Sequence, residues 1–213
     1  MPTISTPGST PAAAQHGAKR GRPGYDQATV LKIAVQAFTE FGYDATSMGM
    51  LAERLGISKS AIYHHVPSKV EILRLALDSA LTPLEAVFDD ASQGSSTALE
   101  RLRGAVSGTL KVLFEHQTSV TLLLRLRGNS EVELAAMERR RALDRHAAAL
   151  VSAAQEEGSV RADLASTTVA RFLFGTVNSL TEWYRPGGNV SEQDAERTIL
   201  AILFDGLVPR SAS

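Results

Sequence analysis

The chain has 213 residues, of which 44% are hydrophobic and 21% are charged, and its formal net charge is −1 at pH 7. These values are typical of a soluble globular protein with one large domain or two unequal ones. The absence of cysteine excludes disulfide bonds, thiolate zinc sites, iron–sulfur clusters and a cysteine nucleophile. Because no apolar run reaches 18 residues and no secretory signal is evident, we expect a cytoplasmic protein without a membrane partner.

Residues 1–24 consist mostly of Pro, Gly, Ser, Thr and Ala, with Met1 and Ile4 as the only large apolar side chains. Such a segment buries too little apolar surface to offset the entropy lost on ordering, so we expect a disordered arm. The arm ends in a basic cluster that contains Arg20 and Arg22. This cluster is either a solubilising tail or a DNA-binding arm, since its Arg-Gly-Arg-Pro core resembles arms that insert arginine into the narrow minor groove of A·T-rich DNA.

Three short helices are predicted after the arm. The first ends at Gly42 and carries an apolar stripe with helical spacing, formed by Val30, Ile33, Ala34, Ala37, Phe38 and Phe41. Thr46 is expected to N-cap a second helix that ends at Gly56, and Ser58 is expected to N-cap a third. Two short helices joined by a glycine-containing turn are typical of a helix-turn-helix.

The outer face of the third predicted helix carries hydrogen-bond donors. Ser60 and Tyr63 point outward and are flanked by Lys59 and His64, which are side chains that contact phosphates and base edges. Through Leu75 there are 8 Lys and Arg against 5 Asp and Glu, and after it there are 14 against 18. Many all-α proteins contain three amphipathic helices, but this outer face and this division of charge favour DNA binding.

Residues 46–69, TSMGMLAERLGISKSAIYHHVPSK, resemble the DNA-binding signature of the TetR family of transcriptional regulators. The resemblance implies three groups of DNA contacts: Thr46 and Ser47 on a phosphate, Ser58, Lys59 and Ser60 at the start of the recognition helix, and Tyr63, His64 and Lys69 on the DNA backbone. The sequence departs from the family at Val66, where phenylalanine is usual. Because Val66 is expected to be a packing residue, this departure concerns helix docking and not base reading.

Patterns that would indicate catalysis or metal binding are absent. His64 and His65 are adjacent, so on a helix they point about 100° apart and cannot easily share one metal ion. His116 and His146 stand alone, without a recognisable Ser, Asp or Glu partner. No Gly-rich phosphate loop, G-x-S-x-G or H-E-x-x-H motif occurs. We therefore expect no metal, no cofactor and no catalytic site.

The rest of the chain predicts a larger helical body. A connector helix at residues 70–90 should kink or restart at Pro83, and a short apolar element covers residues 120–126. Further helices are expected at residues 97–116, 131–157, 163–185 and 191–207, with a solvated or ion-paired Arg139-Arg140-Arg141 run. The prediction is an all-α fold of about nine helices. Its parts are a disordered arm (1–24), a helix-turn-helix domain (25–70), a ligand-binding and dimerisation domain (71–209) and a tail (210–213).

The last two predicted helices, residues 163–185 and 191–207, carry apolar residues beyond a single stripe, including Phe174 and Phe204. This pattern is expected of helices that pack against their own body and a partner at once. We therefore expect a homodimer through a four-helix interface, with packing inside one monomer core as the alternative. A dimer suits DNA reading as well, since each headpiece covers one half of a palindromic operator.

A second, shorter resemblance lies within residues 178–191. Asn178, Trp183, Tyr184, Pro186, Gly188 and Ser191 are similar to the end of the body domain in TetR-family regulators that respond to acyl-coenzyme A thioesters. The resemblance implies that Trp183 and Asn178 border a pocket for an acyl-CoA effector. Arg125 and Arg127 would attract a phosphorylated ligand. The alternatives are that Trp183 anchors a buried helix end and that both arginines form solvated ion pairs.

These patterns together predict a dimeric transcriptional repressor that a small-molecule effector releases from its operator. By linkage, the effector and the DNA must lower each other's affinity by the same factor. The corresponding coupling free energy is typically about 1–3 kcal/mol. Two alternatives belong to other classes. One is a constitutive DNA-binding protein without a ligand, and the other is a small all-α enzyme that uses a pocket in the body.

Overall fold

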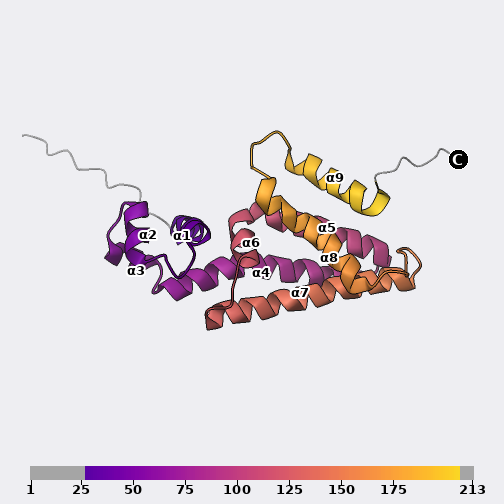
Figure 1. Ribbon diagram of the computed structural model, residues 1–213, viewed down its shortest axis with the longest axis horizontal. Helices are drawn as coiled ribbons and strands as arrows, with labels where there is room; N and C mark the ends of the chain where they lie inside the picture. Colours follow the sequence, from indigo (N-terminus) through magenta and orange to yellow (C-terminus); the bar gives the residue numbers. More distant parts are fainter. Residues whose placement is uncertain (1–26, 207–213) are drawn as a thin grey trace, which may run out of the picture.

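The computed structural model describes residues 27–206, and this part of the chain contains nine α-helices and no strand. The helices are α1 (Gln27–Phe41), α2 (Met48–Leu55), α3 (Lys59–His65), α4 (Lys69–Gln93), α5 (Ala98–Glu115), α6 (Gln117–Leu124), α7 (Glu131–Glu156), α8 (Ser166–Trp183) and α9 (Glu192–Asp205). Figure 1 shows α1–α3 clustered at one end, and α4 leading from them into a body formed with α5–α9. The predicted all-α fold, with a helix-turn-helix headpiece and a larger body, is confirmed. The expected arm, with Arg20 and Arg22, and the expected tail lie outside the described residues.

The headpiece has its own small core. Its fully or almost fully buried members come from all three helices and the following residue: Val30, Ala34, Phe38, Leu51, Leu55, Ile62 and Val66. Gly56 ends α2 in the left-handed conformation, with φ of 66°, which glycine adopts without the steric cost of a side chain. The hydroxyl of Ser58 accepts a hydrogen bond from the Ala61 amide and so caps α3 as expected. Local sequence signals therefore set the geometry of this helix-turn-helix.

α4 is one uninterrupted helix of 25 residues that contains Pro83, so the helix does not restart at this residue. A proline inside a helix costs about 3 kcal/mol or more, because it removes one hydrogen bond and crowds the preceding turn. Leu81 and Leu84 on either side are buried, and each contributes roughly 1.5–3 kcal/mol. Packing against the body therefore outweighs the cost of the proline, and α4 connects the headpiece to the body as a single element.

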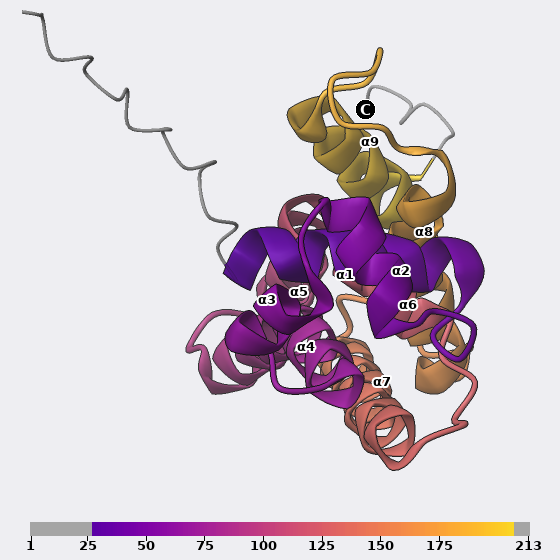
Figure 2. The ribbon, with the colours of Figure 1, turned by 90° about the vertical axis from the view of Figure 1, so that its left-hand side faces the viewer.

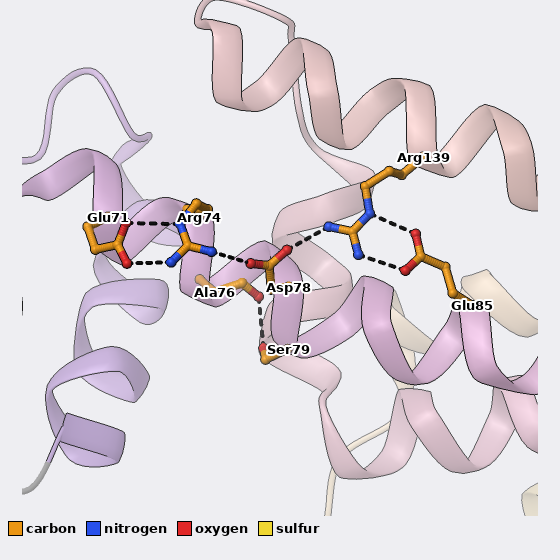
Figure 3. Close-up of polar contacts among 7 residues, drawn as sticks. All are labelled: Glu71, Arg74, Ala76, Asp78, Ser79, Glu85 and Arg139. Carbon is orange, nitrogen blue, oxygen red and sulfur yellow. Dashed lines mark hydrogen bonds and ion pairs between the residues drawn. The ribbon is translucent and has the colours of Figure 1, made fainter.

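An ionic network runs along α4 from Glu71 to Glu85 and joins this helix to α7 (Figure 3). The guanidinium of Arg139 donates two hydrogen bonds of 2.7 Å to the carboxylate of Glu85 and one of 2.6 Å to Asp78. The other oxygen of Asp78 accepts a 2.8 Å hydrogen bond from Arg74, which also binds Glu71. The two carboxylates raise the pKa of Arg139, with Glu85 as the main cause. The network fixes the position of α4 along α7.

Candidate DNA-binding surface and effector cavity

The exposed end of the headpiece is formed by α2 and α3, which face the viewer in Figure 2. Lys59, Ser60 and His64 are exposed, and the side chain of Tyr63 is 45% exposed. Ser60 shares a 2.9 Å hydrogen bond with Ser58, the N-cap of α3. Within residues 27–206, no hydrogen bond or ion pair engages the side chains of Lys59, Tyr63 or His64. Their donors are therefore available to a molecule outside the described part of the chain.

The start of α2 differs from the expectation by one residue. Ser47, not Thr46, is the N-cap, and its hydroxyl accepts a 3.2 Å hydrogen bond from the Met50 amide. The Thr46 side chain is turned inward: the residue is 1% exposed, and its hydroxyl donates a 2.8 Å hydrogen bond to the Gly42 carbonyl. This hydrogen bond gives a partner to the backbone carbonyl that directly follows α1, where the helical hydrogen-bond pattern has ended. The structure thus leaves Ser47, rather than the Thr46 side chain, exposed at the start of α2.

Lys69 has a different environment from the one that the resemblance implies. Its ammonium group donates hydrogen bonds to the carbonyls of Tyr43 at 2.7 Å and Thr46 at 2.8 Å, with a longer one of 3.5 Å to Asp44. It also lies 4.2 Å from the centre of the Tyr43 ring. Burial raises the pKa of the Tyr43 hydroxyl, and the nearby carboxylates of Asp44 and Glu133 add to this effect. Lys69 is thus bound within the headpiece.

The body contains a cavity of about 380 Å³ between α4, α5, α6, α7 and α8. Its apolar lining includes Leu84, Phe88, Leu123, Leu143 and Phe174. A volume of this size lies at the lower end of the range for small-molecule sites, which are mostly apolar with a few placed polar groups.

The polar groups of this cavity are Arg140, Asp144, Arg171 and Asn178, along with two threonines. Arg140 donates one long hydrogen bond of 3.3 Å to the Leu123 carbonyl. Arg171 is exposed at the side of α8, and no ion pair forms between it and a carboxylate in residues 27–206. The cavity therefore combines apolar walls with two cations that carry no carboxylate partner in the described part of the chain.

The structure separates the four residues expected to bind or attract a ligand. Asn178 lines the cavity. Trp183 does not line this cavity, and because the residue is 51% exposed it does not anchor a buried helix end either. The neighbouring Tyr184 is buried instead, and the centre of its ring lies 5.0 Å from the centre of the Phe114 ring. Arg125 and Arg127 line a second cavity of about 480 Å³ between the end of α1 and the segment after α6.

The alternative expectation for Arg125 was an ion pair, and it does form one with Glu182, at 3.6 Å and largely exposed. Sequence reasoning missed Arg140 and Arg171 as cavity residues. Arg140 was visible only as one member of an arginine run, and Arg171 as the one charged residue in the short apolar run 169–175. Neither pattern reveals which side of a helix faces a cavity.

Comparison with known proteins decides the family. Residues 30–76 match the family model described as "Bacterial regulatory proteins, tetR family", and residues 95–207 match the model described as "Tetracyclin repressor-like, C-terminal domain". The chain belongs to the TetR family. TetR-family proteins are transcriptional regulators that bind operator DNA, typically as dimers, and this assignment favours a regulator over an enzyme.

Relatives of this TetR-family chain include the HTH-type transcriptional repressor KstR2 of Mycobacterium tuberculosis, 30% identical over 84% of this chain and 90% of the relative. The crystal structure of SCO3833 from Streptomyces coelicolor A3, a TetR-family member, is 43% identical with a TM-score of 0.79, over 90% of this chain and 94% of that one. AibR, whose structure was determined with isovaleryl coenzyme A and operator DNA, is 20% identical with a TM-score of 0.69, over 84% and 97% of the two chains. That last likeness concerns the fold.

Two further features concern residues 27–206 of this TetR-family chain. No helix there combines the length and the apolar character that a bilayer crossing requires. In the same residues, no cluster of three or more His, Asp or Glu side chains is arranged to hold a metal ion.

Proposed function

We propose that this protein is a dimeric repressor whose affinity for its operator falls when a small-molecule effector occupies the cavity in the body. The observation that carries this proposal is that α4 belongs to both sites. Its first residue, Lys69, lies in the headpiece, whereas Leu84 and Phe88 line the cavity. An effector that shifts α4 must therefore change the position of the headpiece, and a coupling of about 1–3 kcal/mol suffices to change operator affinity 5- to 150-fold.

The proposed DNA contacts are those of the exposed headpiece surface. Ser47 and the free amides at the start of α2 would hold a phosphate, because a helix N-terminus attracts anions. Lys59 and Ser60 would read bases at the start of α3, and Tyr63 and His64 would contact the DNA backbone. The arginines of the N-terminal arm would add minor-groove contacts.

The proposed dimer forms through α8 and α9. Large apolar side chains remain exposed on both helices, with Phe172 at 73%, Trp183 at 51% and Ile202 at 41%. Exposed small residues, including Gly175 on α8 and Ala201 on α9, would allow close helix approach. α9 is held to its own body mainly from one side, where Glu196 accepts a hydrogen bond from Ser107 and Arg103 lies over the ring of Phe204. Two copies of this apolar surface would bury each other in a symmetric interface.

The proposed effector is an acyl-CoA thioester. The apolar walls fit an acyl chain, and Arg140 and Arg171 would bind its carbonyl or phosphate oxygens, with Asn178 as a further hydrogen-bonding group. A cavity of about 380 Å³ suits the acyl part, so the nucleotide part would remain outside, next to Arg171. The AibR complex supports this choice, since that protein shares the fold and was crystallised with isovaleryl coenzyme A.

The experiment that tests the proposal measures binding to DNA that flanks the protein's own gene. Fluorescence anisotropy at fixed salt would be recorded with and without a panel of acyl-CoA thioesters, and free coenzyme A would be the control ligand. Specific binding that one thioester weakens is the expected result. Specific binding that no thioester changes would instead indicate a constitutive DNA-binding protein. Release of free coenzyme A during the assay would indicate an enzyme.

A further inference from the structure

The segment between α1 and α2 is organised by one side chain from α4. Residues 43–46 turn the chain from the end of α1 toward Ser47, the N-cap of α2. Three carbonyls of this segment, those of Tyr43, Asp44 and Thr46, converge on the ammonium group of Lys69. Lys69 is the first residue of α4, 23 positions away from Thr46 along the chain.

The ammonium group of Lys69 makes two short hydrogen bonds and one longer one inside the headpiece. A lysine side chain has three N–H groups, and three carbonyl oxygens lie within 2.7–3.5 Å of the Lys69 nitrogen. The Tyr43 ring covers a further side of the group at 4.2 Å, where it adds a cation–π interaction. A DNA phosphate would have to displace one of these partners. Lys59 on α3 offers the contrast, because it is exposed and no described residue binds its ammonium group.

The same turn also contacts the body. The side-chain amide of Asn129, between α6 and α7, donates a 3.1 Å hydrogen bond to the carboxylate of Asp44. The backbone amide of Asn129 donates to the buried carboxylate of Glu133 on α7, at 2.6 Å. The segment that Lys69 binds therefore leads to the start of α2 and also contacts the body through Asp44.

We propose that Lys69 is a positioning residue for DNA binding: it fixes the start of α2 through the carbonyls of residues 43–46 and makes no contact of its own with a DNA phosphate. A lysine bound to three carbonyls adds to affinity by holding Ser47 and the amides of α2 in place. It does not add to the number of ions that the DNA releases on binding, because that number counts phosphates neutralised by direct contact.

The first test is the salt dependence of DNA affinity for Lys69→Met and Lys69→Arg in the full chain. The probe is a mixed-sequence duplex of about 30 base pairs, long enough for two headpieces. Methionine keeps much of the side-chain length without the donors, and arginine keeps the charge but presents a planar group that does not match three converging carbonyls. Both variants should bind on the order of tenfold more weakly. The slope of log affinity against log salt should stay unchanged in both.

The matched control is Lys59→Met, which removes an exposed lysine proposed to face DNA. It should reduce the slope by about one for each subunit, as expected for a lost phosphate or base-edge cation. If Lys69→Met reduces the slope in the same way and Lys69→Arg restores it, Lys69 contacts phosphate and the proposal is wrong. If both Lys69 variants fold and bind DNA with unchanged affinity, Lys69 contributes only to stability and the proposal is also wrong.

A second measurement uses the unaltered protein and does not depend on the folding of a variant. In ¹⁵N-lysine-labelled protein, the Lys69 ammonium protons should exchange slowly with water, because hydrogen-bonded donors are protected from exchange. Their signal should change little when the duplex is added, whereas the signal of Lys59 should shift. A Lys69 signal that exchanges rapidly in the free protein, or that shifts on DNA binding as much as that of Lys59, would overturn the proposal.

Discussion

The crossing of α4 and α5 depends on a glycine, and replacing it should destabilise the fold by a calculable amount. A Cβ atom at Gly108 would lie 2.7 Å and 2.9 Å from the two γ-methyl carbons of Val87, closer than carbon atoms pack. Overpacking of this kind costs about 1–3 kcal/mol. Alanine is favoured over glycine inside a helix by about 1 kcal/mol, which offsets part of this cost. Gly108→Ala should therefore lower the free energy of unfolding by on the order of 1 kcal/mol.

The same helix provides the matched control. A Cβ atom at Gly104 would meet nothing within 4 Å, so Gly104→Ala should raise the free energy of unfolding by up to about 1 kcal/mol. Urea denaturation followed by circular dichroism, at one fixed protein concentration, measures both changes. The double variant Val87→Ala/Gly108→Ala removes the clashing methyl groups, and it should be more stable than the sum of the two single changes predicts. If Gly108→Ala stabilises the protein as much as Gly104→Ala does, the close packing of α4 on α5 is incorrect.

Three further predictions concern the ionic network, the dimer and the cavity. Arg139→Met should leave the carboxylate of Glu85 without an ion-pair partner and Asp78 with Arg74 alone. Because these side chains are about one-third exposed, the loss of stability should be only about 1 kcal/mol. Acyl-CoA should weaken DNA binding less in this variant than in the unaltered protein. Equal effector responses of the two proteins would contradict this. Phe172→Glu should yield monomers in light scattering while helical content is retained, and a persistent dimer would exclude α8 from the interface. Arg140→Leu should weaken acyl-CoA binding by roughly 10-fold or more in titration calorimetry without changing DNA affinity. An unchanged acyl-CoA affinity would mean that the polar part of the effector does not bind at Arg140.

The headpiece was largely predictable because its signals are local. The apolar stripe of α1, the left-handed turn at Gly56 and the cap at Ser58 each depend on residues a few positions apart. The expected packing role of Val66 is confirmed by its complete burial. Helix positions in the body were also predicted to within a few residues, because caps such as Thr97 and Ser130 precede regular apolar spacing.

Most differences between sequence and structure involve residues whose partners are distant in the chain, and Thr46 is the local exception. Thr46 suits an N-cap by type, but the nearby Gly42 carbonyl captures its hydroxyl and leaves the cap to Ser47. Lys69 carries a family signal for DNA contact, and only the folded headpiece brings three carbonyls to its ammonium group. Pro83 is a helix breaker in isolation, and only packing explains why α4 continues through it. The cavity, with Arg140, forms between five helices and leaves no pattern in any one of them.

The hydrogen bonds of Arg139 to Asp78 and Glu85 hold α4 in its central part, so a tilt of α4 about Glu85 would displace its first residue. At about 1.5 Å per residue, Lys69 lies roughly 24 Å from Glu85 along the helix axis. A rotation of about 5° about Glu85 would move Lys69 by about 2 Å. In a two-fold dimer, the separation of the two headpieces would then change by about 4 Å, compared with the spacing of about 34–36 Å between successive major grooves. The size of this displacement depends on the distance between the pivot and Lys69. If the ion pair with Arg139 lay one helical turn closer to the headpiece, this distance would be shorter by about 5.4 Å and the displacement at the DNA would fall in proportion.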